Sequence, residues 1–348
     1  MLMIPSPRKI RAAASNTSRK ILYGRLADLR SSPADLLDGV REGTVRRYRP
    51  ARDVVPTGPP VLLVPPPAAG AGAAFDLRRG CSLAEHLVAT GRRTYLVDYG
   101  QISYADRDLG LEHWVDELLP AAVRRVSEDA GGQPVQLVGW CLGGIFSVLA
   151  AAARPGLPIA AIASVGAVAD LGRVAPAGAL RPLVENGRKM LGIDRYLLRP
   201  LTVLTNLDNA DLLAQIEAVD AFSDRTAAGP GRSAGERYRS FFRDNDLAGG
   251  RIVIAGREVR LADVNVPVLA IAGRSDAVAP WQSVHPLTRT LTGSPRVRFD
   301  TAPGGHLGVL TGRAARTTTW ARLGKWLDEG ALEHGLRASR PRREAAAR

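Results

Sequence analysis

The sequence predicts an α/β fold built on a doubly wound, mostly parallel sheet. Residues 61–64 form a continuous apolar run, which is typical of a strand buried on both faces of a parallel sheet, and further strand candidates follow at 94–99, 159–165 and 268–273. Segments with helical spacing lie between these candidates, so strands and helices alternate along the chain. The 348 residues are 45% hydrophobic, which is enough for one large core.

The chain before the first buried strand differs from the rest. Scattered apolar residues lie among basic ones up to about residue 35, and we expect a disordered lead followed by an amphipathic helix. Residues 1–40 should therefore form a basic arm, and the alternating segment 44–49 should follow it as an edge strand. The end of the chain, 331–348, is again basic and is expected to be a disordered tail.

The rest of the chain supplies the core and one insertion. Glycine and proline clusters interrupt a helical, irregular region at 176–250, which we interpret as a helical cap inserted over the site. The core then comprises residues 41–175 and 251–330. Its remaining helices are expected at 82–90, 111–126 and 317–327, and a further strand is expected at 296–299.

A turn between an apolar strand and a helix rich in small residues carries the strongest motif. It has the form G-x-C-x-G, with Cys141 between Gly139 and Gly143. This is the nucleophile elbow of α/β hydrolases with cysteine in place of serine, so we predict an α/β hydrolase fold. The strained turn lifts the thiol above the sheet, the helix dipole favours thiolate, and the N–H of Leu142 points to where an oxyanion would form. The alternative is a buried structural cysteine in a glycine-rich turn.

A cysteine nucleophile needs a base, and the base needs an orienting acid. In this fold the chain order is nucleophile, acid, histidine. Asp276 directly follows a buried strand and His306 follows the last strand in a Gly-Gly-His loop, so both are expected at the catalytic edge of the sheet. An aspartate in such a place is otherwise often a helix N-cap. Residues with expected structural or surface roles are His86, His113, His285 and His334, together with Asp98 and Asp106 near the mouth of the pocket.

Charge and cysteine content bear on partners and compartment. The formal net charge is +13, with basic residues concentrated at both ends, and such a surface could meet nucleic acid, anionic lipid or a coenzyme A thioester. The chain shows no zinc spacing, recognition-helix pattern or aromatic RNA-binding stripe, so we expect no nucleic-acid partner. The two cysteines suggest no disulfide framework, and a reducing cytoplasm is expected. Neither a signal peptide nor a transmembrane segment is expected.

Several stretches together carry a resemblance to one family. The box at 139–144 reads Gly-Trp-Cys-Leu-Gly-Gly, and other matches lie at 75–77, 95–100, 105–107, 245–250 and 266–268, in the acid loop at 273–281 and in the histidine loop at 305–306. From about residue 40 to 328 the chain resembles polyhydroxyalkanoate synthases, the α/β-fold enzymes that polymerise hydroxyacyl-coenzyme A.

The resemblance implies a role for each candidate. Cys141 would be the acylated nucleophile, His306 the base and Asp276 its partner. The substrate would be a hydroxyacyl-coenzyme A, with no cofactor besides that thioester, and the acyl group would pass to the hydroxyl end of a growing chain. Pro67 lacks an N–H, so Ala68 would supply the second oxyanion-hole donor unless the loop is rearranged.

Two other functions remain open at this point. The same residues would serve a thioesterase or esterase that transfers the acyl group to water, because only water access and cap shape differ. A non-catalytic binding protein on a degenerate hydrolase fold is the third candidate. A polymer granule, a second synthase subunit and a homodimer are further partners that the sequence leaves open.

Overall fold

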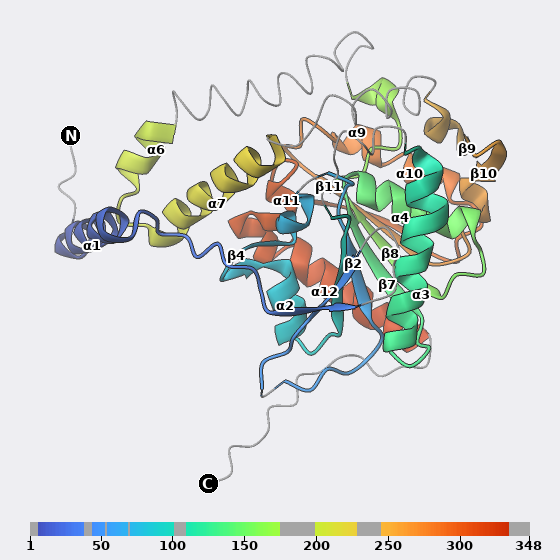
Figure 1. Cartoon of the computed structure of the whole chain (residues 1–348). Helices are drawn as coiled ribbons and strands as arrows, with labels where there is room; N and C mark the ends of the chain where they lie inside the picture. Colours follow the sequence, from blue (N-terminus) through green and yellow to red (C-terminus); the bar gives the residue numbers. More distant parts are fainter. Residues whose placement is uncertain are drawn as a thin grey trace.

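A computed structural model describes residues 6–37, 44–52, 54–68, 70–100, 109–174, 199–227 and 245–333 (Figure 1). Its main feature is an eight-stranded sheet in which all pairings from β6 to β12 are parallel, whereas at one side β2 pairs antiparallel with both β6 and the outermost strand β1. In spatial order the strands are β1 (Ala34–Leu37), β2 (Thr44–Tyr48), β6 (Thr94–Asp98), β3 (Val61–Val64), β7 (Val135–Trp140), β8 (Ile159–Val165), β11 (Val268–Gly273) and β12 (Val297–Ala302). The predicted doubly wound, mostly parallel sheet is confirmed.

Helices cover both faces of this sheet (Figure 1). Apolar side chains of α3 (Leu119–Asp129) and α4 (Leu142–Ala153) pack in one buried cluster, and those of α2 (Leu83–Ala89) and α12 (Thr319–Glu333) pack in the other. Along β3, Leu62 and Val64 belong to the first cluster whereas Val61 and Leu63 belong to the second. Burial on both faces explains why the strands read as continuous apolar runs instead of alternating ones.

Local signals in the sequence account for the helix ends. Ser82 caps α2 by accepting a hydrogen bond from the backbone N–H of Glu85, and Gly91 follows the helix with a positive φ of 82°. A single π-helical stretch, η3 (His113–Leu118), leads into α3, so the predicted helix at 111–126 is present with an irregular first turn. The last helix, α12, extends to Glu333 and so runs beyond the predicted end at 327.

Segment 44–49, predicted as an edge strand, is β2, and it is not at the edge of the sheet. Its outer neighbour is β1, which pairs antiparallel with it and falls within the expected basic arm. Arg47 and Arg49 of the β2 region form ion pairs with Asp35 of β1, so a short acidic and apolar segment can complete the sheet. The sequence also failed to indicate the hairpin of β9 (Arg251–Ile254) and β10 (Arg257–Arg260).

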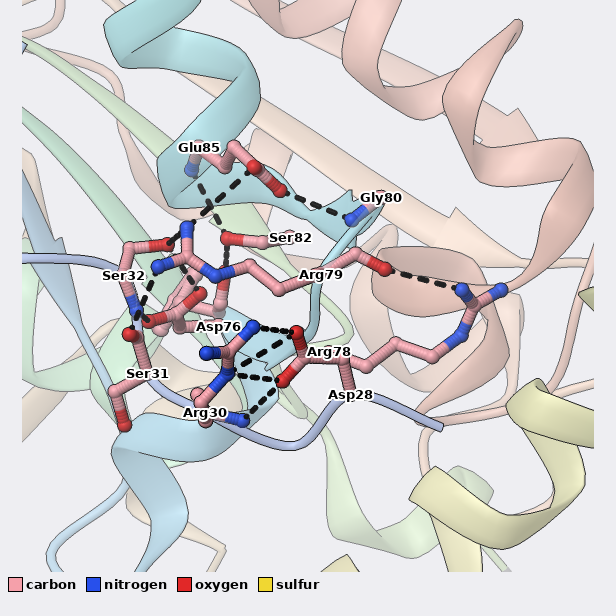
Figure 2. Close-up of polar contacts among 11 residues, drawn as sticks. Asp28, Arg30, Ser31, Ser32, Asp76, Arg78, Arg79, Gly80, Ser82 and Glu85 are labelled. Atoms are coloured by element: carbon pink, nitrogen blue, oxygen red, sulfur yellow. Dashed lines mark hydrogen bonds and ion pairs between the residues drawn. The ribbon is translucent and has the colours of Figure 1, made fainter. Parts of the chain in front are cut away.

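The N-terminal arm contains the expected helix, α1 (Pro7–Tyr23), which lies beside α7 (Ala210–Ala227) in Figure 1. Glu217 of α7 accepts hydrogen bonds from Lys20 and from the backbone N–H groups of Leu26 and Ala27. Further along, Asp76 of β4 (Asp76–Arg78) accepts from both the N–H and the hydroxyl of Ser32 (Figure 2). Two polar networks therefore attach the arm to the body, while four large apolar side chains of α1 stay exposed: Ile10, Ile21, Leu22 and Tyr23.

The region expected to be a cap is described only in part. Within it the structure contains α6 (Arg199–Thr205), α7 and the short η6 (Asp246–Gly249), while 175–198 and 228–244 lie outside the described residues. Of the expected disordered tail at 331–348, residues 331–333 are helical and belong to α12, so the prediction is wrong there, and 334–348, with His334, lie outside the described residues. Asp106 also lies outside them. Within the described residues, no helix combines the length and the apolar character needed to cross a membrane.

Candidate active site

Cys141 occupies the tight turn between β7 and α4. Its backbone has φ 56° and ψ −127°, a left-handed conformation that a residue with a Cβ rarely adopts. Its N–H donates to the carbonyl of Val165 at 2.9 Å, and its carbonyl accepts from the N–H of Gly144 at 3.0 Å. These bonds to the neighbouring strand and to the first turn of the helix hold the strained residue in place, as the elbow motif predicts.

The two glycines of the motif are required by close packing. A Cβ at Gly139 would lie 2.5 Å from the carbonyl oxygen of Gly143, and a Cβ at Gly143 would lie 2.0 Å from the carbonyl oxygen of Val64. Both contacts are with backbone atoms, which cannot move aside as a flexible side chain would. The G-x-C-x-G spacing thus permits α4 to start directly against the ends of β7 and β3.

Asp276 and His306 come together from the two strands at the far side of the sheet. Asp276 follows β11 and His306 follows β12, and Oδ2 of Asp276 lies 2.9 Å from Nδ1 of His306. The other carboxylate oxygen of Asp276 accepts from the backbone N–H groups of Val278 and Ala279, at 2.9 and 2.8 Å. The carboxyl side chain is fully buried, so these bonds fix both its orientation and that of the imidazole.

Cys141 is the second neighbour that affects the charge of His306. Burial of the ring disfavours its charged form and lowers the pKa of His306. The interactions with Cys141 and Asp276, by charge and by hydrogen bonding, act in the opposite direction and outweigh burial. Together these effects raise the pKa of His306 to about 10. In the folded protein His306 therefore stays protonated well above pH 6.5, which is the ordinary pKa of histidine. Its contribution to stability is complete below pH 6.5 and is lost as the pH rises through about 10.

The two expected oxyanion donors differ in this structure. Leu142 is the first residue of α4, where the N–H has no carbonyl available within the helix. The N–H of Ala68, in contrast, donates to the carbonyl of Pro66 at 2.8 Å. As the loop stands, Ala68 is not a free donor, because the Pro-Pro-Pro segment folds back on itself; the rearranged loop is the alternative that agrees with this geometry. Tyr99 holds the start of the loop by donating its hydroxyl to the carbonyl of Pro65 at 3.0 Å.

Sequence reasoning assigned no role to Gly166, which also faces the site. Gly166 directly follows β8 with φ 59°, and a Cβ there would lie 3.5 Å from Nδ1 of His306 and 3.6 Å from Oδ2 of Asp276. A Cβ would therefore be in ordinary van der Waals contact with the pair, and the positive φ would strain any side chain at this position. The signal was a glycine placed immediately after a fully buried strand, between the strand that precedes Cys141 and the strand that precedes Asp276.

The alternative histidines and acids have other partners. His86 packs on Trp320, His113 contacts Trp114 and Glu117, and His285 packs edge-on against Phe299. Asp98 binds Arg46 and accepts from the N–H of Gly100. Across the described residues, no group of three or more His, Cys, Asp or Glu side chains could hold a metal ion.

The environments of the two cysteines predict unequal reactivity. Cys81 is 1% exposed, its thiol donates to the carbonyl of Thr311 and the guanidinium of Arg316 is its basic neighbour, whereas Cys141 is partly exposed and has His306 as its basic neighbour. Both thiols thus have a basic group nearby, and access to the reagent separates them. In the native protein, iodoacetamide should modify Cys141 at least about tenfold faster than Cys81 near neutral pH, as read by peptide mass spectrometry. Equal, slow rates at both cysteines would contradict an activated thiol.

Fold and site together define an α/β hydrolase fold with cysteine at the nucleophile elbow. In agreement, the family model described as alpha/beta hydrolase fold matches residues 59–313. Among solved structures, a meta-cleavage product hydrolase from Pseudomonas fluorescens has a TM-score of 0.51 at 18% identity, covering 86% of this chain and 98% of that one, which bears on the fold alone.

Curated relatives identify the family within this fold. A poly(3-hydroxyalkanoate) polymerase subunit PhaC from Allochromatium vinosum is 30% identical over 276 residues, which is 73% of this chain and 76% of the relative. The same subunit from Thiocystis violacea is 26% identical over 340 residues, with 89% and 92% covered. The chain belongs to the α/β hydrolase fold family and, within it, to the PhaC family of polymerase subunits, and it is an enzyme.

Proposed function

We propose that this protein is an acyltransferase of the polyhydroxyalkanoate synthase type. It takes hydroxyacyl groups from hydroxyacyl-coenzyme A and passes them to the hydroxyl end of a growing chain. The proposal is supported by the 2.9 Å contact between Asp276 and Nδ1 of His306, by the position of Cys141 in the strained turn after β7, and by the similarity to PhaC subunits. The PhaC relatives are named as poly(3-hydroxyalkanoate) polymerase subunits, which supports a growing polyester chain as the acyl acceptor.

The first half of the reaction forms an acyl-enzyme. The Cys141 thiolate attacks the thioester carbonyl, and the oxyanion that forms accepts a hydrogen bond from the N–H of Leu142. When the intermediate collapses, the bond to the coenzyme A sulfur breaks, and the His306 imidazolium supplies the proton that the leaving thiolate takes. The bonds made and broken are both thioesters, so little free energy separates substrate from acyl-enzyme.

The second half returns the enzyme to its starting state. His306, now neutral, accepts the proton of the chain-end hydroxyl as its oxygen attacks the acyl-enzyme, and Cys141 leaves as thiolate beside the restored imidazolium. Because Nδ1 of His306 is engaged with Asp276, Nε2 is the nitrogen left for these transfers. Asp276 keeps the ring oriented and exchanges no proton itself.

No cofactor takes part in this scheme, since the thioester supplies the activated acyl group. The net charge of +13 suits a substrate that carries phosphates. A thiolate nucleophile must remain reduced, and for this reason we place the enzyme in the cytoplasm.

Incubation of the purified protein with 3-hydroxybutyryl-coenzyme A tests the proposal. Release of free coenzyme A together with insoluble polyester is the expected result. Release of coenzyme A together with free hydroxy acid would show that water is the acceptor and that the protein is a thioesterase. If no coenzyme A is released, with or without an added second synthase subunit, the remaining interpretation is a non-catalytic binding protein.

A further inference from the structure

Trp140 links the nucleophile strand to the histidine loop. It is the last residue of β7, directly before Cys141, and only 5% of it is exposed. Its indole N–H donates to the backbone carbonyl of His306 at 3.0 Å. Its ring also lies against the imidazole of His306, with 5.1 Å between ring centroids and 37° between the planes. One side chain therefore contacts the histidine through both its backbone and its ring.

Phe222 of α7 contacts Trp140 in turn. The two ring centroids are 6.3 Å apart and the planes are inclined by 60°. The position of α7 is fixed near its N-terminal end, where Asp211 binds Arg78 at 2.6 Å and Arg316 at 3.1 Å. One turn further along, the Gln215 amide donates to the carbonyl of Thr311. The helix of the inserted region is thus docked on the core in a way that places Phe222 against Trp140.

These contacts have two physical consequences for His306. The hydrogen bond to its carbonyl fixes the backbone of a loop that carries two glycines, 304 and 305, directly before it. The face of an indole attracts a cation, so the ring contact favours imidazolium over imidazole. Among the described residues, the titratable groups that act on His306 are Asp276 and Cys141, while Gly166 after β8 faces the ring and Phe222 of α7 acts through Trp140.

We propose that Trp140 is a positioning residue that fixes the backbone and the ring of His306 at the site, and that Phe222 makes this hold depend on the docking of α7. The inference rests on the proposed function, in which His306 first serves as imidazolium and then as base. It adds a link between the inserted region and the histidine. If α7 shifts, the Trp140 ring loses its support and the histidine loses a cation-binding face.

The test is the pH profile of Cys141 modification by iodoacetamide, read by peptide mass spectrometry. Wild-type Cys141 should react faster than Cys81 at every pH from about 6.5 to 9, because it is the accessible thiol and has His306 as its neighbour. In Trp140→Ala the rate at pH 7 should fall about three- to tenfold and the profile should rise later with pH, because the thiolate is less favoured. Trp140→Phe keeps an aromatic face and should fall between the two, and Phe222→Leu should shift the profile in the same direction.

Trp320→Phe is the matched control. Trp320 is also 5% exposed, also donates its indole N–H to a backbone carbonyl, that of Leu310 at 2.8 Å, and also lies on an imidazole, that of His86 at 5.0 Å. Its replacement should lower the thermal stability to a similar degree and leave the Cys141 profile unchanged. Wild-type profiles in Trp140→Ala and Phe222→Leu would overturn this inference alone. An ordinary thiol profile in the wild-type protein itself would overturn the proposed function and this inference together.

Discussion

Replacing Cys141 by alanine should lower the rate of coenzyme A release from a hydroxyacyl thioester by at least about a thousandfold, since no other group can form the acyl-enzyme. The fold should survive, because alanine fills less space than cysteine and the turn is fixed by backbone hydrogen bonds to Val165 and Gly144. Coenzyme A release is measured with a thiol reagent on the purified variant, and circular dichroism and thermal unfolding check the fold.

Cys81→Ala is the control for this variant. Cys81 is buried far along the chain from the elbow and bonds the carbonyl of Thr311, so its removal should change stability more than rate. Cys141→Ser retains a nucleophile, but its hydroxyl is far harder to ionise, and we expect most of the activity to be lost there too. Wild-type rates in Cys141→Ala would mean that the elbow cysteine takes no part in the chemistry.

Replacing Asp276 by asparagine should reduce coenzyme A release on the order of a thousandfold. The backbone N–H groups of Val278 and Ala279 would keep the amide oxygen, which leaves the amide nitrogen facing Nδ1 of His306. That nitrogen donates, so Nδ1 must accept and the ring proton moves to Nε2. A neutral ring in this tautomer cannot accept a proton from the attacking group. The loss should appear in kcat and in kcat/KM alike, because the ring is used only as bonds form and break.

A second buried carboxylate provides the matched control. Asp76 is also buried and accepts two hydrogen bonds, both from Ser32 (Figure 2). Asp76→Asn should destabilise the attachment of the N-terminal arm while the chemistry at Cys141 continues. Equal losses of activity in Asp76→Asn and Asp276→Asn, in proportion to the loss of stability, would argue that Asp276 has only a structural role.

The sequence predicted the parts of the site that depend on strand ends. Cys141, Asp276 and His306 each follow a strand of the parallel sheet, and the carboxyl ends of parallel strands meet at one edge, so their convergence could be expected from order alone. The elbow was predictable because two close backbone approaches require glycine at 139 and 143. In each case the signal was local, with residue types that have a single physical reason to occur there.

What the sequence did not indicate depends on contacts between distant segments. β1 has only four residues, one of them an aspartate, and its pairing with β2 is what makes it a strand. The bond from Ala68 to Pro66 depends on how the proline loop folds back, which residue types alone do not determine. The contacts of Trp140 join residues 82 positions apart, to Phe222, and 166 apart, to His306, so no local pattern could reveal them.

The most direct test of the account is the mass of Cys141 during a single turnover. The protein is mixed with a stoichiometric amount of 3-hydroxybutyryl-coenzyme A, quenched in acid and digested, and the peptide that contains Cys141 is weighed beside the peptide that contains Cys81. The account predicts that Cys141 alone carries one hydroxybutyryl group, and that Cys141→Ala carries none. Coenzyme A release with no acyl group on Cys141 at any time, or acylation of the two cysteines alike, would contradict it.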